Sequence, residues 1–554
     1  MKSEWYYAGV ICFEIRQLMN TDFCVNGKEL FKMSSGKKTV EKKASTKNGV
    51  LRVIFVIIAF CLEIAFIVGL IHSGIDQYAE IVSVVIRILG LLLVLALYSQ
   101  DTPPSLKIPW IILILLAPPI GVALYLMIGL AGSTKKMKER YENEDRQLMP
   151  FLVQNNEVSD ELAMTHPSCS GVSRYIFRES KYPVYHNSKV DYFADASDGL
   201  ESQKKDMREA KKFIFMEYFA IENAESWKGV EDILAEKAAE GLDVRVFYDD
   251  VGSIGFINVD FVKSLEKRGI KCRVFNPMTP FLNFFLNNRD HRKMTIIDGK
   301  IGYTGGYNMA NEYFNVTSPY GYWKDTGIRI EGEAVRALTA TFLSMWNAVR
   351  DNDKDDTHYG TFFPAADRQE RVDGYVQFYA DSPMDKLPVG EDVYMSMANR
   401  AKKYLHIITP YLIITDEMNR TLGLAAKRGV DVRIVTPGIP DKPLIYKITR
   451  SYYSHLAMSG VRIFEYTPGF CHAKMSVSDD IIATCGTINM DYRSLYHHFE
   501  CGCLMIESDA VLAIRDDFED IFAKSTEVTE TYRSGRSAVL RFGQLLLRVA
   551  APLL

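Results

Sequence analysis

The stretch His291-Arg-Lys293-Met-Thr-Ile-Ile-Asp298 recurs downstream as His472-Ala-Lys474-Met-Ser-Val-Ser-Asp479. Both stretches follow the pattern H-x-K-x-x-x-x-D. Each is followed at a matching distance by a glycine turn and an asparagine, in Gly305-Gly306-Tyr307-Asn308 and in Gly486-Thr487-Ile488-Asn489. One match would be weak evidence of a function, but two copies in register indicate a duplicated functional element.

Each copy is predicted to form a β-hairpin, because β-formers separate its lysine from its aspartate and a second short strand follows, at 301–304 and at 481–485. Residues two apart on a strand project from the same face, so the histidine and the lysine of each copy should point together. An imidazole can be a nucleophile or a general acid near neutral pH, and an ammonium group beside it favours an anion such as phosphate. Glycines next to the hairpin would let the backbone approach that anion.

The aspartates of the motif allow two interpretations. Asp298 and Asp479 could take part in the chemistry with the histidines and lysines. Asp298-Gly299 and Asp479-Asp480 are also turn signals whatever the chemistry, so a structural role is the alternative. The sequence leaves both roles open.

Internal similarity extends beyond the motifs. Residues 211–215 and 239–247 parallel residues 402–407 and 426–435, and residues 267–275 resemble 458–464. Apolar β-runs alternate with Ala- and Leu-rich helical stretches, which predicts α/β units around a mainly parallel sheet. Two similar halves facing each other would bring the two His-Lys hairpins together.

Composition narrows the function classes. A formal net charge of −4 argues against a nucleic-acid binder, which would usually carry a basic face. The nine cysteines include no C-x-x-C pair, and the sequence contains no H-E-x-x-H, so neither a zinc framework nor a disulfide framework is predicted.

The N-terminal quarter is apolar enough to predict a membrane region. Residues 51–71 and 81–98 are long apolar runs, and a third run at 108–130 contains Pro118-Pro119. Lysines and arginines flank this block on both sides, at 37–47 and at 135–140. Positive flanks favour the cytoplasm, so we expect a multi-pass protein of the cell membrane with an even number of crossings and a cytoplasmic catalytic region.

The sequence divides into six expected parts. These are an unassigned N-terminal extension (1–49), a transmembrane region (50–132), a linker (133–170), a first half (171–365), a second half (366–535) and an apolar C-terminal tail (536–554). The tail could be an interfacial helix or a helix that packs on the core.

The duplicated motif resembles that of the phospholipase D superfamily, whose members carry two H-x-K-x4-D motifs in two halves that meet at one active site. Within it the chain is most similar to the bacterial cardiolipin synthases, from about residue 50 to the end. The stretches that carry this resemblance are Gly486-Thr-Ile-Asn489-Met-Asp-Tyr-Arg493-Ser494, Phe499-Glu500, Asp250-Val-Gly252-Ser253, Trp323-Lys-Asp325 and Ala551-Pro552-Leu-Leu.

The resemblance implies a phosphodiester exchange on phosphatidylglycerol. His291 would attack the phosphate and form a phosphatidyl-histidine, while His472 protonates the leaving glycerol and then acts as base on a second alcohol. A second phosphatidylglycerol gives cardiolipin, and water makes the enzyme a phospholipase D. The order of the two histidines rests on the resemblance alone, because the sequence is nearly symmetric.

The resemblance also implies the remaining site residues. Its catalytic set is His291, Lys293, Asp298, His472, Lys474 and Asp479. Lys293, Lys474, Asn308 and Asn489 would hold the phosphate oxygens, and Asp325 and Glu500 would orient the imidazoles. No metal or other cofactor is implied, and the expected partners are phosphatidylglycerol and membrane lipid.

Three other functions remain as alternatives. One is a membrane phosphatidyltransferase of another specificity, such as a phosphatidylserine synthase. The others are a nuclease, which the membrane spans and the acidic balance disfavour, and a non-catalytic membrane scaffold, which two intact motifs disfavour. Near the second motif, His497 and His498 are adjacent and should point to opposite faces, so one of them is interpreted as packing.

Overall fold

The computed structural model describes residues 79–126, 134–277, 288–350, 358–364, 371–372, 374–385, 387–534, 547–549 and 551. The expected extension at 1–49, the apolar run at 51–71 and most of the expected tail at 536–554 lie outside the described residues.

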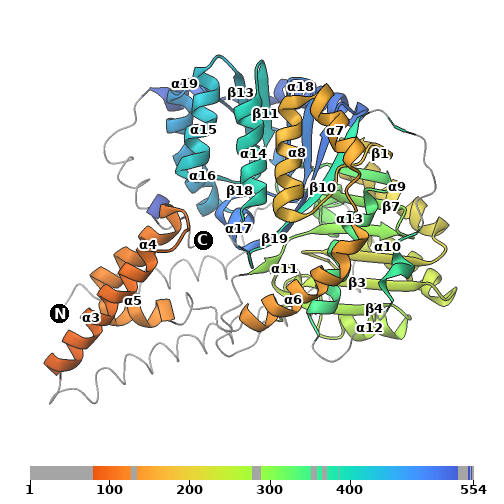
Figure 1. Cartoon of the computed structure of the whole chain (residues 1–554), viewed down its shortest axis with the longest axis horizontal. Coiled ribbons are helices and arrows are strands. Elements are labelled where there is room, and N and C mark those ends of the chain that lie inside the picture. The colour runs from red at the N-terminus through yellow and green to blue at the C-terminus, as the bar shows by residue number, and fades with distance from the viewer. Residues whose placement is uncertain are drawn as a thin grey trace, which may run out of the picture. The chain divides into compact units, whose positions relative to one another are not determined.

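Each half of the chain folds around a β-sheet (Figure 1). The first sheet has the order β1-β9-β7-β6-β2-β3-β4, and its strands are β1 (Ser188–Phe193), β2 (Phe213–Tyr218), β3 (Asp243–Asp249), β4 (Lys271–Phe275), β6 (Lys293–Ile297), β7 (Ile301–Gly305) and β9 (Gly327–Gly332). The second has the order β10-β19-β17-β16-β11-β13-β14-β20, and its strands are β10 (Tyr375–Asp381), β11 (Tyr404–Ile408), β13 (Asp431–Pro437), β14 (Arg462–Tyr466), β16 (Met475–Ser478), β17 (Ile482–Gly486), β19 (His498–Ile506) and β20 (Ser525–Glu527). The first seven positions of the two orders correspond, which confirms the predicted duplication.

The hairpin prediction is confirmed, but the prediction of a mainly parallel sheet is wrong. The motif hairpins are β6–β7 and β16–β17, both antiparallel. In the first sheet only β2–β3 and β3–β4 pair in parallel, whereas β6 is antiparallel to β2, and β9 is antiparallel to both β7 and β1. A hairpin joins antiparallel strands by its geometry, so each motif shifts its sheet to a mixed arrangement.

Alternate residues of β2 belong to different hydrophobic clusters, as the strand period of two requires. Phe213 and Phe215 join the large cluster that contains residues of both halves, while Ile214 and Met216 join a cluster built from the other face of the first sheet. All six residues of β2 are buried. Such a continuous buried run is typical of a central strand that is covered on both faces.

Two corresponding helices connect the halves. Helix α13 (Val335–Ala348) follows β9 and contacts β6, β7 and β9 of its own sheet together with β10 of the other. Helix α18 (Asp509–Ala523) follows β19 and contacts β16, β17 and β19 together with β1 of the first sheet. Each helix therefore packs its own sheet against the first strand of the partner sheet, and the two halves share one core.

The remaining helices surround these sheets. In the first half they are α9 (Ala196–Glu209), α10 (Glu225–Ala239), α11 (Asp250–Ser253), α12 (Phe261–Lys267) and α13 (Val335–Ala348). In the second they are α14 (Val389–Arg400), α15 (Asp416–Lys427), α16 (Pro443–Met458), α17 (Tyr492–Tyr496), α18 (Asp509–Ala523) and α19 (Thr529–Arg533). Before the first sheet come α6 (Thr134–Leu148), α7 (Asn156–Thr165) and α8 (Pro167–Ser180). Helix α8 packs on β10 and α14, so the expected boundary at residue 171 falls within a helix that contacts the second sheet.

The described part of the apolar N-terminal block forms α3 (Ala79–Tyr98), α4 (Pro104–Leu116) and α5 (Pro118–Leu124). The paired prolines at 118–119 begin α5, where a missing N–H costs no hydrogen bond. Within the part of the chain that the structure describes, no helix combines the length and the apolar character that a membrane crossing needs.

Candidate active site

Two short parallel pairings between the halves place the two histidines. Strand β5 (Arg289–Asp290) pairs with the start of β19, and β15 (Gly469–Cys471) pairs with β8 (Tyr322–Lys324). The next residue in each case is the motif histidine, held by its backbone: His291 N donates to Phe499 O at 2.9 Å and His472 N to Lys324 O at 2.7 Å. Each histidine is thus aligned by a strand from the opposite half of the chain.

These pairings bring each imidazole to a carboxylate of the other half. His291 Nδ1 lies 2.8 Å from Glu500 Oε1, and His472 Nδ1 lies 2.7 Å from Asp325 Oδ2. All four side chains are buried. Asp325 and Glu500 occupy the places that the resemblance implied for orienting acids, and neither half can assemble a His–carboxylate pair alone.

The carboxylates differ in their surroundings. Burial raises the pKa of Glu500 well above its ordinary value, against the opposing effect of Lys293. Burial also acts to raise the pKa of Asp325, but His472 and Lys474 outweigh it and hold that pKa below its ordinary value. Asp325 therefore remains an anion at neutral pH and can stabilise a positive charge on His472.

The two lysines lie beside their histidines. Lys293 Nζ donates to His291 O at 2.5 Å, while Lys474 Nζ lies 2.8 Å from His472 Nδ1 and donates to His472 O. Burial lowers the pKa of Lys293 to about 8 and that of Lys474 to about 7. A bound phosphate would favour the charged ammonium forms, so anion binding and lysine protonation reinforce each other.

Burial and the lysines also keep the histidines neutral. The pKa of His291 lies well below its ordinary value because of burial and Lys293, and burial with Lys474 lowers the pKa of His472 to about 3. A neutral imidazole that donates Nδ1–H to a carboxylate keeps a lone pair at Nε2, which is the form a nucleophile or a general base needs.

The two asparagines have unequal partners. Asn308 Oδ1 accepts from Ala220 N at 3.1 Å and its Nδ2 donates to Tyr313 Oη at 2.8 Å, so both ends of this amide are already engaged. The Oδ1 atom of Asn489 is buried with no hydrogen-bond partner. Of the two, Asn489 retains the greater capacity to interact with a ligand.

The motif aspartates lie at the far ends of their hairpins, roughly 16 Å of strand beyond the lysines. Asp298 accepts from the backbone N–H groups of Lys211, Lys212 and Phe213 at 2.7–3.0 Å, and Asp479 accepts in the same way from three N–H groups at 402–404. Both have positive φ, as a type I′ turn demands. Of the two roles left open by the sequence, these contacts favour the structural one, and they separate both aspartates from the histidines.

Replacing Asp298 by glycine should therefore reduce stability and not the chemical step. Glycine tolerates the positive φ, and the loss of a carboxylate that binds three N–H groups should lower the unfolding free energy by about 2–4 kcal/mol. Thermal unfolding and kcat per folded enzyme measure the two effects separately. A variant of normal stability with a strongly reduced kcat would restore the catalytic interpretation.

Gly306 was expected to let the backbone approach a bound anion, but its surroundings show a different role. A Cβ at this position would lie 2.0 Å from Asp325 Oδ1, so its lack of a side chain makes room for the carboxylate that holds His472, rather than for a bound anion. At Gly486 a Cβ would meet Cys501 O at 2.4 Å, again a protein atom. The glycines after the hairpins allow close approach between strands.

The variant Gly306→Ala should displace Asp325 and reduce kcat by about 100-fold or more, because an orienting carboxylate is worth that much in comparable sites. The control is Gly171→Ala in α8, where an added Cβ meets no atom within 4 Å. The measurements are kcat from steady-state kinetics and the unfolding temperature, for both variants. Equal rates in the two variants would contradict this view of Gly306.

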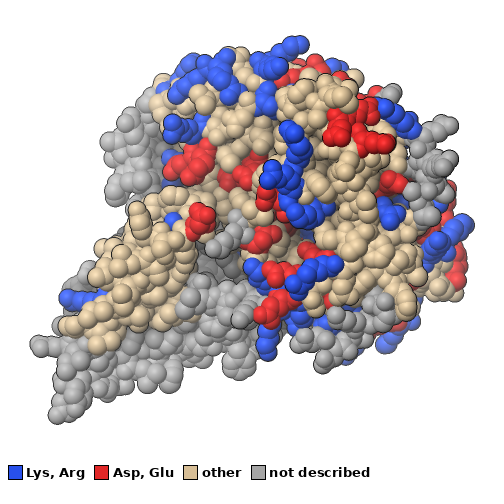
Figure 2. All heavy atoms as spheres, in the orientation of Figure 1, with Lys and Arg blue, Asp and Glu red and all other residues tan. Residues whose placement is uncertain are grey.

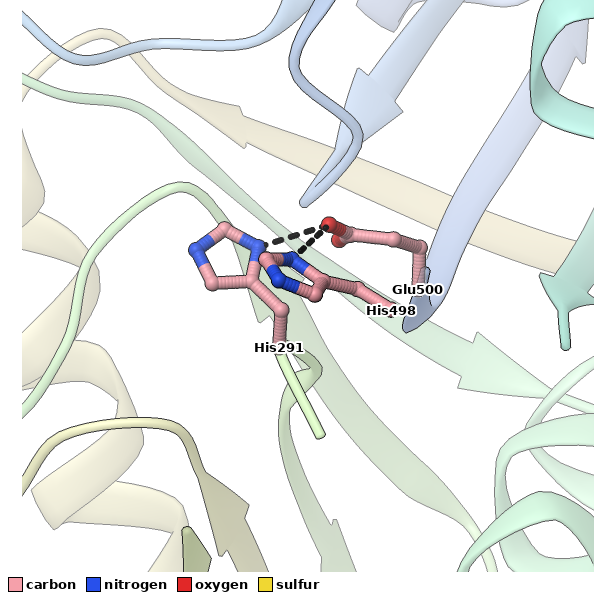
Figure 3. Close-up of side chains that lie close together, drawn as sticks. All are labelled: His291, His498 and Glu500. Carbon is pink, nitrogen blue, oxygen red and sulfur yellow. Dashed lines mark hydrogen bonds and ion pairs between the residues drawn. The ribbon is translucent and has the colours of Figure 1, made fainter. Parts of the chain in front are cut away.

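Sequence reasoning missed several neighbours of the histidines. Thr487, a residue of the glycine turn, donates to Glu500 Oε2 at 2.5 Å. The ring of His498 lies 5.4 Å from that of His291 (Figure 3). In the other half, the ring of Trp323 takes the corresponding place, 5.4 Å from that of His472. Trp323 and His498 each precede an orienting acid by two residues, a correspondence that the sequence contains but that gains meaning only from the geometry.

This arrangement can carry out displacement at phosphorus. It offers two neutral imidazoles with oriented Nδ1 atoms, two ammonium groups of adjustable charge and a buried environment that strengthens their interaction with phosphate oxygens. The cluster contains a nucleophile, a proton donor and charge stabilisation without any further group.

Comparisons with known proteins agree with this chemistry. The family described as "Cardiolipin synthase, PLD-like domain" matches residues 204–346 and 394–522, one segment in each half. Cardiolipin synthase 1 of Staphylococcus aureus is 34% identical over 457 residues, which cover 80% of this chain and 91% of that protein. An uncharacterised protein of Streptococcus mutans is 38% identical over 461 residues, 83% of this chain and 99% of the relative.

A solved structure supports the fold. The phosphatidylserine synthase of Haemophilus influenzae matches with a TM-score of 0.53 and 15% sequence identity, covering 69% of this chain and 99% of that one. The resemblance drawn from the duplicated motif is therefore confirmed by both halves of the chain. This protein belongs to the cardiolipin synthase family of the phospholipase D superfamily.

Proposed function

We propose that this protein is a cardiolipin synthase, which transfers a phosphatidyl group from one phosphatidylglycerol to another and releases glycerol. The observation that carries the proposal is the pair of His–carboxylate contacts across the two halves, at 2.8 and 2.7 Å. The name of the S. aureus relative supplies the substrate class, because the site itself has the chemistry for phosphodiester exchange with more than one alcohol.

In the proposed first step, Nε2 of His291 attacks the phosphorus of phosphatidylglycerol. A nitrogen–phosphorus bond forms and the bond from phosphorus to the glycerol oxygen breaks. His472, which must take up a proton from solvent at Nε2 when the anionic phosphate enters the site, gives that proton to the glycerol oxygen. Glu500 holds the Nδ1 proton of His291, and Asp325 stabilises His472 while it is protonated. The product of this step is phosphatidyl-histidine and free glycerol.

In the second step the neutral His472 accepts the proton of a headgroup hydroxyl on a second phosphatidylglycerol. The oxygen forms a bond to phosphorus, the nitrogen–phosphorus bond breaks, and cardiolipin leaves with His291 restored. Lys293 and Lys474 contact the two motif histidines and would hold phosphate oxygens through both steps, and the amide N–H₂ of Asn489 would donate to one of them.

A membrane location fits a lipid substrate. Several large apolar side chains of α3 are more than half exposed: Val84, Val85, Ile88, Leu91, Leu92 and Leu95. On the face shown in Figure 2, α3–α5 carry few charged side chains, and basic and acidic residues are interspersed over the two halves. We assign the N-terminal block to the membrane, as a multi-pass region with the catalytic halves in the cytoplasm, and expect phospholipid rather than nucleic acid as substrate.

The test is incubation of the full-length protein with labelled phosphatidylglycerol, in the presence of a chelator, followed by mass spectrometry of the lipids. Cardiolipin and glycerol in equal amounts are expected. Phosphatidic acid as the sole product would mean that water is the acceptor and that the protein is a phospholipase D. A phosphatidyl product that forms only when serine is added would identify a phosphatidylserine synthase.

A further inference from the structure

The ring of His498 is a buried imidazole without a hydrogen bond. Its exposed fraction is 9%, and neither Nδ1 nor Nε2 has a hydrogen-bond partner. Its Nδ1 faces Glu500 Oε1 across 3.6 Å, too long for a hydrogen bond, while the same oxygen binds His291 Nδ1 at 2.8 Å (Figure 3). Burying an imidazole with no partner is costly, so this ring lies ready for a ligand that the reaction described above does not supply.

From these contacts we propose that His291, His498 and Glu500 form a zinc site, and that zinc bound there inhibits the enzyme. One ligand atom from each residue lies within 4.8 Å of the others. Two histidines and one glutamate are a donor set that zinc uses, with metal–ligand bonds of about 2.0–2.2 Å. In tetrahedral geometry such bonds place neighbouring donors about 3.3 Å apart, close to the 2.8 and 3.6 Å found here.

Zinc would stop the reaction by changing which nitrogen of His291 carries the proton. To bind the metal, Nδ1 must give up the proton that it donates to Glu500. The imidazole stays neutral if that single proton moves to Nε2 through solvent, while Nδ1 bonds to the metal. The nitrogen that would attack phosphorus has no lone pair in this state, so the metal blocks the nucleophile without occupying the phosphate position.

The basic groups around the cluster oppose a cation, and their effect is limited. Lys293 and Lys474 act on His291, while Arg289 and Arg493 act with Lys293 on His498. Lys293 Nζ is turned to the backbone oxygen of His291 at 2.5 Å, and Arg289 is paired with Asp249 at 3.4 Å. Glu500 supplies a full negative charge once the metal stabilises its ionised form, so the donor set outweighs the remaining positive charge.

The site is specific to one half of the chain. At the corresponding position beside His472 stands Trp323, and Tyr313 and Phe470 complete an aromatic surround. None of these side chains is a zinc ligand. The His472–Asp325 pair has no third donor among the residues that the structure describes, so zinc should bind one site per chain.

The first test measures metal binding alone, with Co²⁺ as a visible probe and Zn²⁺ by calorimetry, on the full-length protein without lipid. Wild type should bind one Co²⁺ per chain with the absorption of a four-coordinate ion. His498→Asn should bind at least about 100-fold more weakly, since it lacks one of three ligands. His497→Asn is the matched control, because His497 follows helix α17 and lines a cavity that includes neither His291 nor Glu500, so this variant should bind like wild type.

The second test measures inhibition, and it rests on the proposed function. Zn²⁺ should inhibit cardiolipin formation by wild type and by His497→Asn, and a chelator should restore it, whereas the residual rate of His498→Asn should not respond. Equal Co²⁺ binding by the two variants, or no stoichiometric binding by wild type, would overturn the site. Binding as expected in a protein that makes no cardiolipin would overturn the proposed function and leave the metal site intact.

Discussion

Replacing His291 by alanine is expected to lower the rate of cardiolipin formation by at least about 10⁴-fold, because the substitution removes the group that forms the covalent intermediate. The imidazole contacts Glu500 across the interface of the two halves, and no other described side chain could take its place at the same point in space. His498 cannot substitute, since its ring lies 5.4 Å away. The measurement is lipid product formation over long incubation, with circular dichroism to confirm folding.

Two controls make the His291 result specific. His497→Ala removes a neighbouring imidazole that lines a cavity without His291 or Glu500, and it should retain most of the activity. His472→Ala should also lose turnover but should still release glycerol once per enzyme, slowly, if His291 is the nucleophile. An alanine variant at His291 that retains several per cent of the wild-type rate would refute its role as nucleophile.

The substitution Asp325→Asn should reduce kcat by about 10²–10⁴-fold with a smaller change in KM, because an amide neither fixes the tautomer of His472 nor stabilises its protonated form. Asp325 is buried, and its Oδ2 atom lies 2.7 Å from His472 Nδ1, so the substitution acts directly on this imidazole. Its Oδ1 atom accepts from Thr326 N at 2.9 Å, which asparagine can preserve.

The matched control for Asp325 is Asp517→Asn, which weakens a nearby buried ion pair. Asp517 binds Lys324 Nζ at 2.8 Å and lies outside the histidine cluster. This variant should lose stability and keep its kcat. Equal loss of kcat in both variants would show that Asp325 acts through packing of the interface and not through His472.

Much of this site is predictable from the duplicated motif, because hairpin signals are local. Turn residues and β-formers determine β6–β7 and β16–β17, and the His-Lys spacing follows from the strand period. The pairing of His291 with Glu500 is not local, since 209 residues separate them. Only the family resemblance implies that the carboxylates at 325 and 500 orient the imidazoles. Only the structure shows that each carboxylate contacts the histidine of the opposite half.

The failures also have physical reasons. Alternating apolar strands and helices do not reveal strand direction. The sequence therefore predicts a mainly parallel sheet, although in the first sheet only β2–β3 and β3–β4 pair in parallel. Glycine motifs show that two groups approach closely, but not which groups, and at Gly306 the neighbour is Asp325. Adjacent histidines point to opposite faces, yet the sequence does not say which face meets the active site, and so His498 was not distinguished from His497.

The proposed phosphatidyl transfer passes through His291, with His472 as its acid and base. Its most direct test is to mix the His472→Ala variant with phosphatidylglycerol, quench the reaction, digest the protein and locate any phosphatidyl adduct by mass spectrometry. We expect an adduct on His291, accompanied by glycerol in equal amount and absent from the His291→Ala variant. An adduct on another residue, or cardiolipin formation by wild type with no covalent intermediate under rapid quench, would contradict it.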